Sequence, residues 1–184
     1  MKNNKMIAMM LTMSMLAAAF AGCLGGDDED DTPDWSISMA SDVSADFVES
    51  AWDPIIPNLN AGDMCDAIIS AMTKTDEREQ AVDFTRAYYT SSQAVIGGSG
   101  AASISAVADL NADGTTIGVQ SGTTSDLYAQ ANLGAATISA YEDFPSVIAA
   151  LNNGDVHYAM GDAPVLALEG TLMVTFSDEN FGMA

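Results

Sequence analysis

Residues 66–90 read DAIISAMTKTDEREQAVDFTRAYYT and hold the pattern that decides the fold. The apolar run MCDAIIS predicts a strand over residues 64–70. Thr75 then suits the N-cap of a short helix, because Asp76 and Glu77 occupy its first turn, where the helix dipole favours acids. A strand that leads through a polar loop into a helix is the repeating unit of an α/β fold.

The same alternation continues along the rest of the chain. Strands are predicted over residues 93–96, 116–119, 137–140, 156–160 and 172–176, and helices after Asp53-Pro54, from Gly122, over 145–151 and from Pro164. This order predicts an α/β fold with a largely parallel sheet. The glycine-rich stretch GGSGAAS, residues 97–103, is the best internal boundary.

Five polar or charged residues follow strands of this pattern, in the loops where α/β folds bind their ligands. Arg78 offers a planar fork of donors for a carboxylate, and N–H groups at a helix start near Thr124 add anion stabilisation. Asp162 ends a strand and can accept from an ammonium group. The hydroxyls of Ser70, Thr73 and Thr124 can donate or accept. Together these residues suit a zwitterion.

Each of the three main candidates also has a plainer interpretation. Arg78 would be a surface cation paired with a nearby acid, Thr124 a simple helix cap, and Asp162 a cap that precedes Pro164. Their equivalent positions in an alternating fold favour the ligand interpretation for the set.

The composition bounds the size and the partners of the protein. A chain of 184 residues that is 48% hydrophobic can pack one domain or two small lobes. Only five Lys and Arg oppose 26 acids, a net charge of −21. The sequence therefore predicts no nucleic-acid partner, since such binding needs a basic face. It also predicts no catalytic residue, no metal and no cofactor.

The first 22 residues have the features of a secretory signal peptide. Lys2 and Lys5 precede an apolar run of 16 residues, Met6 to Ala21. The run is shorter than the roughly 20 residues that a spanning helix needs.

The signal ends in Phe20-Ala21-Gly22-Cys23, which is similar to a lipobox, although Phe20 stands where Leu is usual. We predict that Cys23 is lipidated after cleavage. The alternatives are a signal that leaves Cys23 unmodified and an uncleaved anchor. Cys65 is the other cysteine, and a buried thiol is its expected role.

The stretch after Cys23, LGGDDEDDTPD, predicts a solvated acidic tether within an atypical segment over residues 23–51. Three cations and 26 acids follow Cys23, which leaves a charge of about −23. Such a surface repels anionic lipid and suits a salty medium.

Four stretches carry a resemblance to a known family: residues 52–91, then IGVQSGTTSD, VIAALNNGDVHYAMGD and FGMA. They resemble the extracellular solute-binding proteins of the polar amino acid type (family 3), the receptor subunits of ABC importers. The resemblance implies a periplasmic-binding-protein-like (type II) fold, whose two lobes close on a ligand about a hinge of two crossing strands.

The resemblance divides the chain and assigns roles to the candidate residues. It implies a partial first lobe over 52–98, a second lobe over 99–176, and the start of the return hinge strand over 177–184. In relatives, the residues at the positions of Arg78, Thr73 and Thr124 grip the ligand's α-carboxylate. Those at the positions of Ser70 and Asp162 contact its α-amino group.

Part of the first lobe that is typical of the family has no counterpart here. Residues 34–51 stand where relatives have a strand, a helix and an aromatic residue that stacks on the ligand, and the sequence stops where relatives continue with a strand and a helix. We expect a first lobe that is short by about one βα unit. A truncated gene model, a degraded gene and a reduced domain completed by a partner are the three explanations.

The expected function is that of a lipid-anchored receptor on the outer face of the cytoplasmic membrane. It would bind an amino acid or similar zwitterion without catalysis and deliver it to an ABC permease. The alternatives are a sensing or interaction domain, a non-functional fragment, or an enzyme on the same scaffold. An enzyme is disfavoured because the only histidine, His157, lies within a predicted strand and no nucleophile motif is present.

Overall fold

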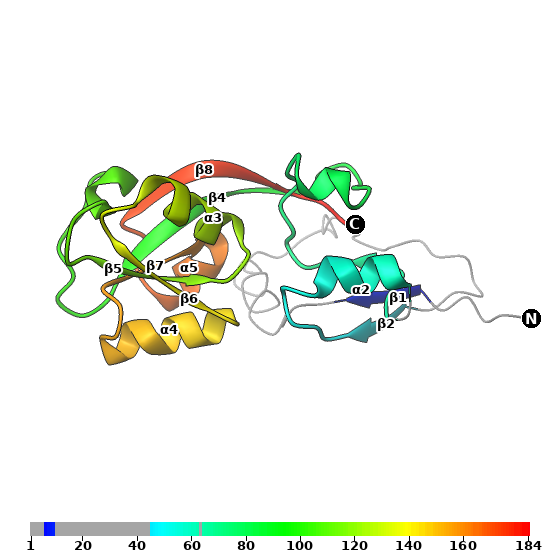
Figure 1. Ribbon diagram of the computed structural model, residues 1–184, viewed down its shortest axis with the longest axis horizontal. Helices are drawn as coiled ribbons and strands as arrows, with labels where there is room; N and C mark the ends of the chain where they lie inside the picture. The colour runs from blue at the N-terminus through cyan, green and yellow to red at the C-terminus, as the bar shows by residue number, and fades with distance from the viewer. Residues whose placement is uncertain (1–5, 10–44, 63) are drawn as a thin grey trace, which may run out of the picture.

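Two sheets divide the chain into two lobes, as Figure 1 shows for the computed structural model of residues 6–9, 45–62 and 64–184. The first lobe comprises β1 (Met6–Met9), β2 (Ala45–Val48), α2 (Ile55–Ala61), β3 (Ala67–Ile68) and the 3-10 helix η2 (Arg78–Gln80). The second comprises β4 (Tyr89–Gly97), the 3-10 helix η3 (Val107–Leu110), β5 (Thr116–Gln120), α3 (Thr124–Asn132), β6 (Thr137–Tyr141), α4 (Phe144–Asn153), β7 (Tyr158–Asp162), α5 (Ala163–Glu169) and β8 (Val174–Phe181).

The second lobe is built on a five-stranded sheet in the order β6-β5-β7-β4-β8. β5 runs parallel to β6 and β7, whereas β4 runs antiparallel to β7 and β8. The α/β alternation is therefore confirmed, but the sheet is mixed rather than largely parallel. The two antiparallel pairings arise because β4 and β8 are the strands that connect the lobes.

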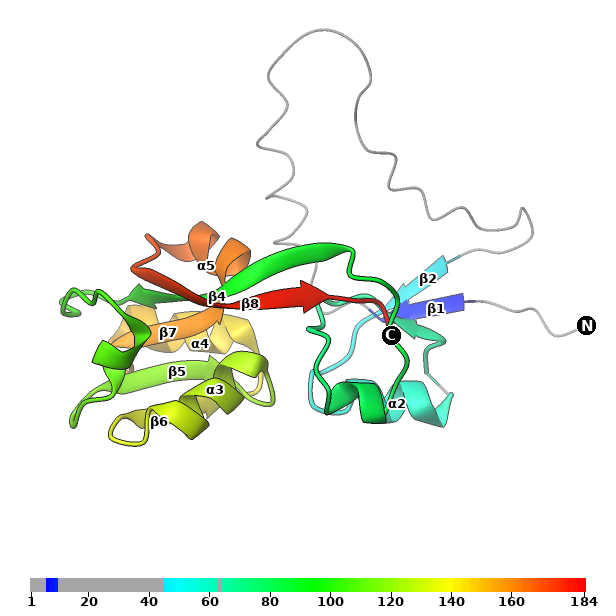
Figure 2. The ribbon, with the colours of Figure 1, turned by 90° about the horizontal axis from the view of Figure 1, so that it is seen from above.

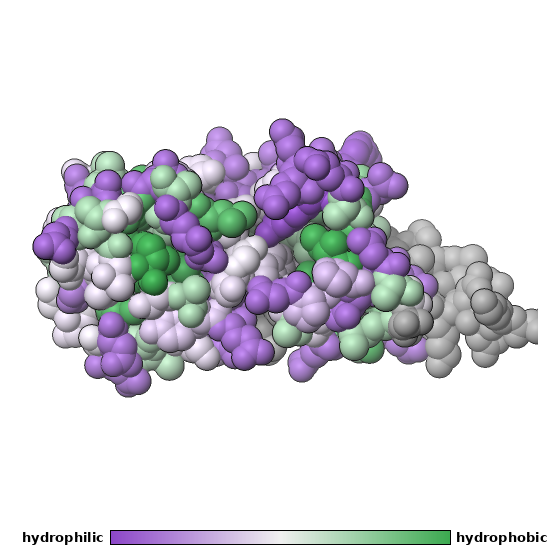
Figure 3. All heavy atoms as spheres, in the orientation of Figure 1, coloured by the Kyte–Doolittle hydropathy of each residue, from purple (hydrophilic) through white to green (hydrophobic). Residues whose placement is uncertain are grey.

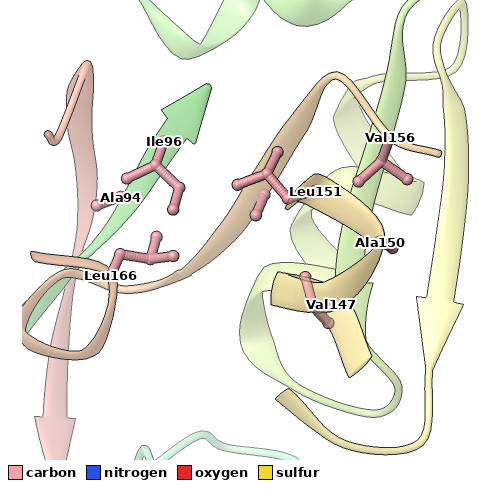
Figure 4. Packing of buried hydrophobic residues seen from close by; sticks show 8 residues of the cluster. Ala94, Ile96, Val147, Ala150, Leu151, Val156 and Leu166 are labelled. Atoms are coloured by element: carbon pink, nitrogen blue, oxygen red, sulfur yellow. The ribbon is translucent and has the colours of Figure 1, made fainter. Parts of the chain in front are cut away.

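Helices cover both faces of this sheet because successive residues of a strand point to opposite sides. Ala94 and Ile96 of β4 pack on one face against α4 and α5, in the cluster drawn in Figure 4. Val95 packs on the other face with α3 and η3. The second lobe thus has two hydrophobic layers and a complete core.

The first lobe has a smaller, parallel sheet in the order β2-β1-β3. Its core joins Trp52 and Ile55 at the start of α2 to Cys65, Ile68 and Met72. The buried thiol predicted at Cys65 is confirmed. The strand predicted over 64–70 is wrong in extent, because only Ala67 and Ile68 pair with a neighbour.

Met6–Met9 forms the middle strand of this sheet, although it belongs to the run predicted as a secretory signal. Its residues pair with Ala45–Val48 on one side and with Ala67 and Ile68 on the other. A signal peptide is removed on export, so the two roles exclude each other in one mature chain. Without Met6–Met9, β2 and β3 would lose the neighbour that joins them.

Helix starts differ in detail from the predicted ones. Thr123, not Thr124, caps α3, since its side chain accepts from the Asp126 amide. Thr75 accepts from the Arg78 amide at 3.2 Å, but the helix that follows is a single 3-10 turn whose N-cap is Glu77, not Thr75 as predicted. Asp53 makes no side-chain cap for α2, whose N-cap is Pro54.

β4 and β8 lie side by side and antiparallel, so that β4 runs from the first lobe into the second and β8 runs back toward the first, as Figures 1 and 2 show. The Tyr88 amide donates to the Phe181 carbonyl at 2.9 Å, and Thr73 bridges to Phe181. β8 continues to Phe181, so the strand predicted over 172–176 is too short. These two strands form the hinge.

On the face drawn in Figure 3, hydrophilic side chains are interspersed with hydrophobic ones on both lobes. Within the described residues, no helix combines the length and the apolar composition needed to cross a bilayer. Cys23 and the acidic tether LGGDDEDDTPD lie outside the described residues.

Candidate functional site

The carbonyl oxygen of Gly122 joins the two lobes. It accepts from Trp52 Nε1 at 3.1 Å and from Arg78 Nη2 at 3.3 Å. Arg78 Nη1 donates to the Thr73 carbonyl at 2.9 Å. The guanidinium carbon lies 5.2 Å from the centroid of the Trp52 ring, in the range of a cation–π contact. Arg78 is therefore held in one orientation at the junction of the lobes.

A pocket of about 120 Å³ lies beside this guanidinium. Its wall is of mixed polarity, with one carboxylate and one guanidinium, and consists of Trp52, Asp53, Ile55, Ile56, Met72, Arg78 and Gly122. A wall of this kind can contact both an apolar and a charged part of a small molecule.

The backbone of Gly122 favours a glycine at this junction. Its φ is +68°, in the left-handed region, and a Cβ there would lie 2.9 Å from Asp53 Oδ1. Its amide donates to Asp126 Oδ2 at 3.0 Å, which fixes the turn before α3. The left-handed turn that brings the Gly122 carbonyl to the first lobe is thus one that a glycine adopts without strain.

Gln93 organises the polar side of the site in the second lobe. The residue is buried, with 1% of its surface exposed. Its Nε2 donates to Asp162 Oδ1 at 2.6 Å and to Thr124 Oγ1 at 3.2 Å, and its Oε1 accepts from Ser125 Oγ. One amide therefore links the end of β7 to the first turn of α3.

The charges of the site influence one another. The pKa of Asp162 is raised from 3.8 to about 6. Burial is the main cause and the charge of Glu179 adds to it, whereas the hydrogen bond from Gln93 and the charge of Arg78 lower the pKa. Burial also lowers the pKa of Arg78, while the carboxylates of Glu179 and Asp162 oppose that shift. The guanidinium stays charged, because an arginine does not deprotonate in proteins.

Ser70 lies in a constrained loop just after β3. Ala71 has a φ of +52°, which is uncommon for a non-glycine residue. Its amide donates to the Tyr88 hydroxyl at 3.0 Å. Ser70 Oγ is buried and finds no hydrogen-bond partner within the described residues, so it can accept from or donate to a further group.

The predicted residues fall into two groups in the structure. Arg78 contacts the Thr73 backbone in the first lobe, and Thr124 and Asp162 meet through Gln93 in the second. Ser70 stands at the end of β3 with its hydroxyl unsatisfied. Among the described residues, no three His, Cys, Asp or Glu side chains are grouped so as to hold a metal ion.

Sequence reasoning missed Trp52 and Gln93. Trp52 precedes a helix start, where an aromatic residue is typical of core packing. Gln93 begins the apolar run QAVI, and its polarity inside a strand was the available signal. A buried amide needs hydrogen-bond partners on neighbouring elements, and those partners proved to be site residues.

Comparison with known proteins identifies relatives. The family described as bacterial extracellular solute-binding proteins, family 3, matches residues 36–144. A probable histidine-binding protein from Neisseria gonorrhoeae is 30% identical over 161 residues, which are 81% of this chain and 59% of that protein. An L-arginine-binding protein from Pseudomonas aeruginosa is 42% identical over 91 residues, 50% of this chain and 34% of that protein.

Solved structures agree with these relatives. An ancestral amino acid-binding protein, described as a precursor of cyclohexadienyl dehydratase, is 26% identical with a TM-score of 0.75; the match covers 97% of this chain and 80% of that one. The chain thus spans 59% or less of the two curated relatives and most of a solved structure. The family match covers more than half of the sequence, and the chain belongs to the bacterial extracellular solute-binding proteins of family 3.

Proposed function

We propose that the cleft between the lobes binds an α-amino acid without catalysis. The observation that carries this proposal is the placement of Arg78 at the lobe junction, near Asp162 of the other lobe. A guanidinium has five N–H donors, and the bonds to Thr73 and Gly122 employ one on each terminal nitrogen. The donors that remain suit a carboxylate.

The two lobes would bind opposite ends of the ligand. The α-carboxylate would lie between Arg78 and the first amides of α3, where the helix dipole favours an anion. Thr73 and Thr124 would add hydroxyls, and Asp162 with Ser70 would accept from the α-ammonium. The ligand would thus replace or join the direct contact between Arg78 and Gly122.

The side chain of the ligand would extend into the pocket beside Trp52. The Asp53 carboxylate in the pocket wall favours a cationic side chain, and the Trp52 indole favours a ring-bearing one. Relatives named as histidine-binding and arginine-binding proteins support this choice. L-arginine and L-histidine are therefore the first ligands to test.

Delivery to an ABC permease is the proposed role of the bound complex, as expected for this family. We further propose that the chain is exported and held at the outer face of the cytoplasmic membrane by a lipid on Cys23. An enzyme is disfavoured because the curated relatives are named as binding proteins.

Replacing Arg78 by alanine should weaken the binding of L-arginine by about 30-fold or more, since losing one partner of a hydrogen-bonded charge pair costs about 2–5 kcal/mol. Isothermal titration calorimetry measures the change. Arg86→Ala is the matched control, because Arg86 is an exposed residue of the same segment and its replacement removes the same charge. Equal affinities of Arg78→Ala and Arg86→Ala would exclude the carboxylate role.

Binding should also depend on pH. An ammonium binds the ionised form of Asp162, whose pKa in the ligand-free protein is about 6. Affinity is therefore full above this pKa and falls below it, approaching about tenfold per pH unit. Asp162→Asn should bind L-arginine weakly with a flat profile from about pH 5 to 7.

His157→Gln is the control for this titration, because the only histidine of the chain lies just before β7, at the opposite end of that strand from Asp162. It should retain the pH profile of the unmodified protein. A profile that His157→Gln abolishes, or that Asp162→Asn preserves, would contradict the role of Asp162.

Lipid anchoring should appear in membrane fractions of cells that express the full chain. Labelled fatty acid should enter the protein and be lost in Cys23→Ala but not in Cys65→Ala, and mass spectrometry should show a chain that begins at Cys23. A chain that retains Met6–Met9 would instead keep the middle strand of the first-lobe sheet, and that result would contradict processing before Cys23.

A further inference from the structure

β8 contains one extra residue next to the site. Ser92 of β4 lies opposite Asp178, whereas Gln93 lies opposite Phe176, so Ser177 has no counterpart. Ser177 has a φ of +49°, a left-handed conformation that is uncommon for a non-glycine residue. The extra residue is a β-bulge, a device that redirects the side chains of a strand.

This bulge decides which acid of β8 faces the cleft. Directly opposed residues of antiparallel strands share a face, and so do residues two apart on one strand. Glu179 lies opposite Ser91 and therefore shares the face of Gln93. Without the bulge, Asp178 would lie opposite Ser91 and Glu179 would point to the other side.

Glu179 is buried and incompletely paired. Only 3% of the surface of this residue is exposed. Oε1 accepts from Ser177 Oγ at 3.4 Å, and Oε2 is buried without a hydrogen-bond partner in the described part of the chain. A buried carboxylate is costly unless it is paired, so this oxygen calls for a donor that the described residues do not supply.

Arg78 is not that donor. Among the described residues, no nitrogen of Arg78 lies within 4.0 Å of a Glu179 carboxylate oxygen. The ion pair at that distance joins Lys74 Nζ to Glu79 Oε1 at 3.8 Å. Glu179 is nevertheless near enough to raise the pKa values of both Asp162 and Arg78. Its charge therefore acts on the two charged groups of the site, while its Oε2 has no hydrogen-bond partner among the described residues.

We propose that Glu179 is a second carboxylate of the ammonium subsite and that it holds the ligand's α-ammonium together with Asp162. The inference rests on the proposed amino acid function and adds a hinge residue to it. An ammonium carries three N–H donors. Three acceptors match these donors: Asp162 in the second lobe, Glu179 Oε2 in the hinge and the unsatisfied Ser70 Oγ in the first lobe.

A second carboxylate also affects specificity. Arg78, Asp162 and Glu179 together carry one excess negative charge when both acids are ionised. A ligand that lacks the ammonium leaves two buried acids unpaired, which the site rejects. The subsite therefore selects amino acids, and cationic ones in particular, over the corresponding carboxylic acids.

The test compares Glu179→Gln with Asp178→Asn, an exposed neighbour that points to the other side of β8. Calorimetry with L-arginine and with its deaminated analogue gives the two affinities. Glu179→Gln should weaken L-arginine binding by about tenfold or more, the loss of one charge-assisted hydrogen bond, and should not weaken binding of the analogue. Asp178→Asn should change neither.

Equal losses for both ligands, or none for L-arginine, would overturn the role of Glu179. If the unmodified protein binds L-arginine and Asp162→Asn weakens that binding while Glu179→Gln does not, this inference alone fails. If the unmodified protein binds neither L-arginine nor L-histidine, the proposed function fails.

A second measurement covers a Glu179→Gln variant that does not fold. The carboxyl carbon of Glu179 in the unmodified protein, observed by carbon NMR, should shift when L-arginine is added and stay in place when the deaminated analogue is added. A signal that responds to neither ligand, or equally to both, would count against the ammonium contact.

Discussion

The site depends on one oxygen atom, the carbonyl of Gly122. It receives hydrogen bonds from Trp52 and Arg78, both of which belong to the first lobe. The carbonyl is presented by a left-handed turn, a conformation that favours glycine. Because the contact fixes the guanidinium at the lobe junction, it also fixes where an anion can bind. The pocket beside Trp52 and the electrostatic influence of Arg78 on Asp162 follow from the same placement.

The hinge contributes more than a connection. Gln93 of β4 holds Asp162 and Thr124 in position with a single amide. On the paired strand β8, the bulge at Ser177 turns Glu179 toward the same face. The charge of Arg78 in the first lobe thus interacts with two acids, Asp162 in the second lobe and Glu179 in the hinge. This distribution of charge suits a ligand that carries both signs, and it would link binding to the relative position of the lobes.

Much of the second lobe could be predicted from the sequence, because its strands and helices alternate with clear caps and apolar runs. Arg78 and Asp162 could be predicted as site residues because each follows a predicted strand. The bulge at Ser177 could not be predicted, since no glycine marks its left-handed backbone. Trp52 was missed because it resembles a core residue, and Gln93 because its role depends on partners 31 and 69 residues away. The strand Met6–Met9 was missed because an apolar N-terminal run is typical of a signal peptide.

The most direct test of the account is a crystal structure of the protein with L-arginine bound. We expect the ligand in the cleft between the lobes, with its α-carboxylate about 2.7–3.2 Å from the Arg78 nitrogens and its α-ammonium at Asp162. A ligand bound outside this cleft, or inside it with the carboxylate turned away from Arg78, would contradict the central claim that Arg78 at the lobe junction determines where and how the ligand binds.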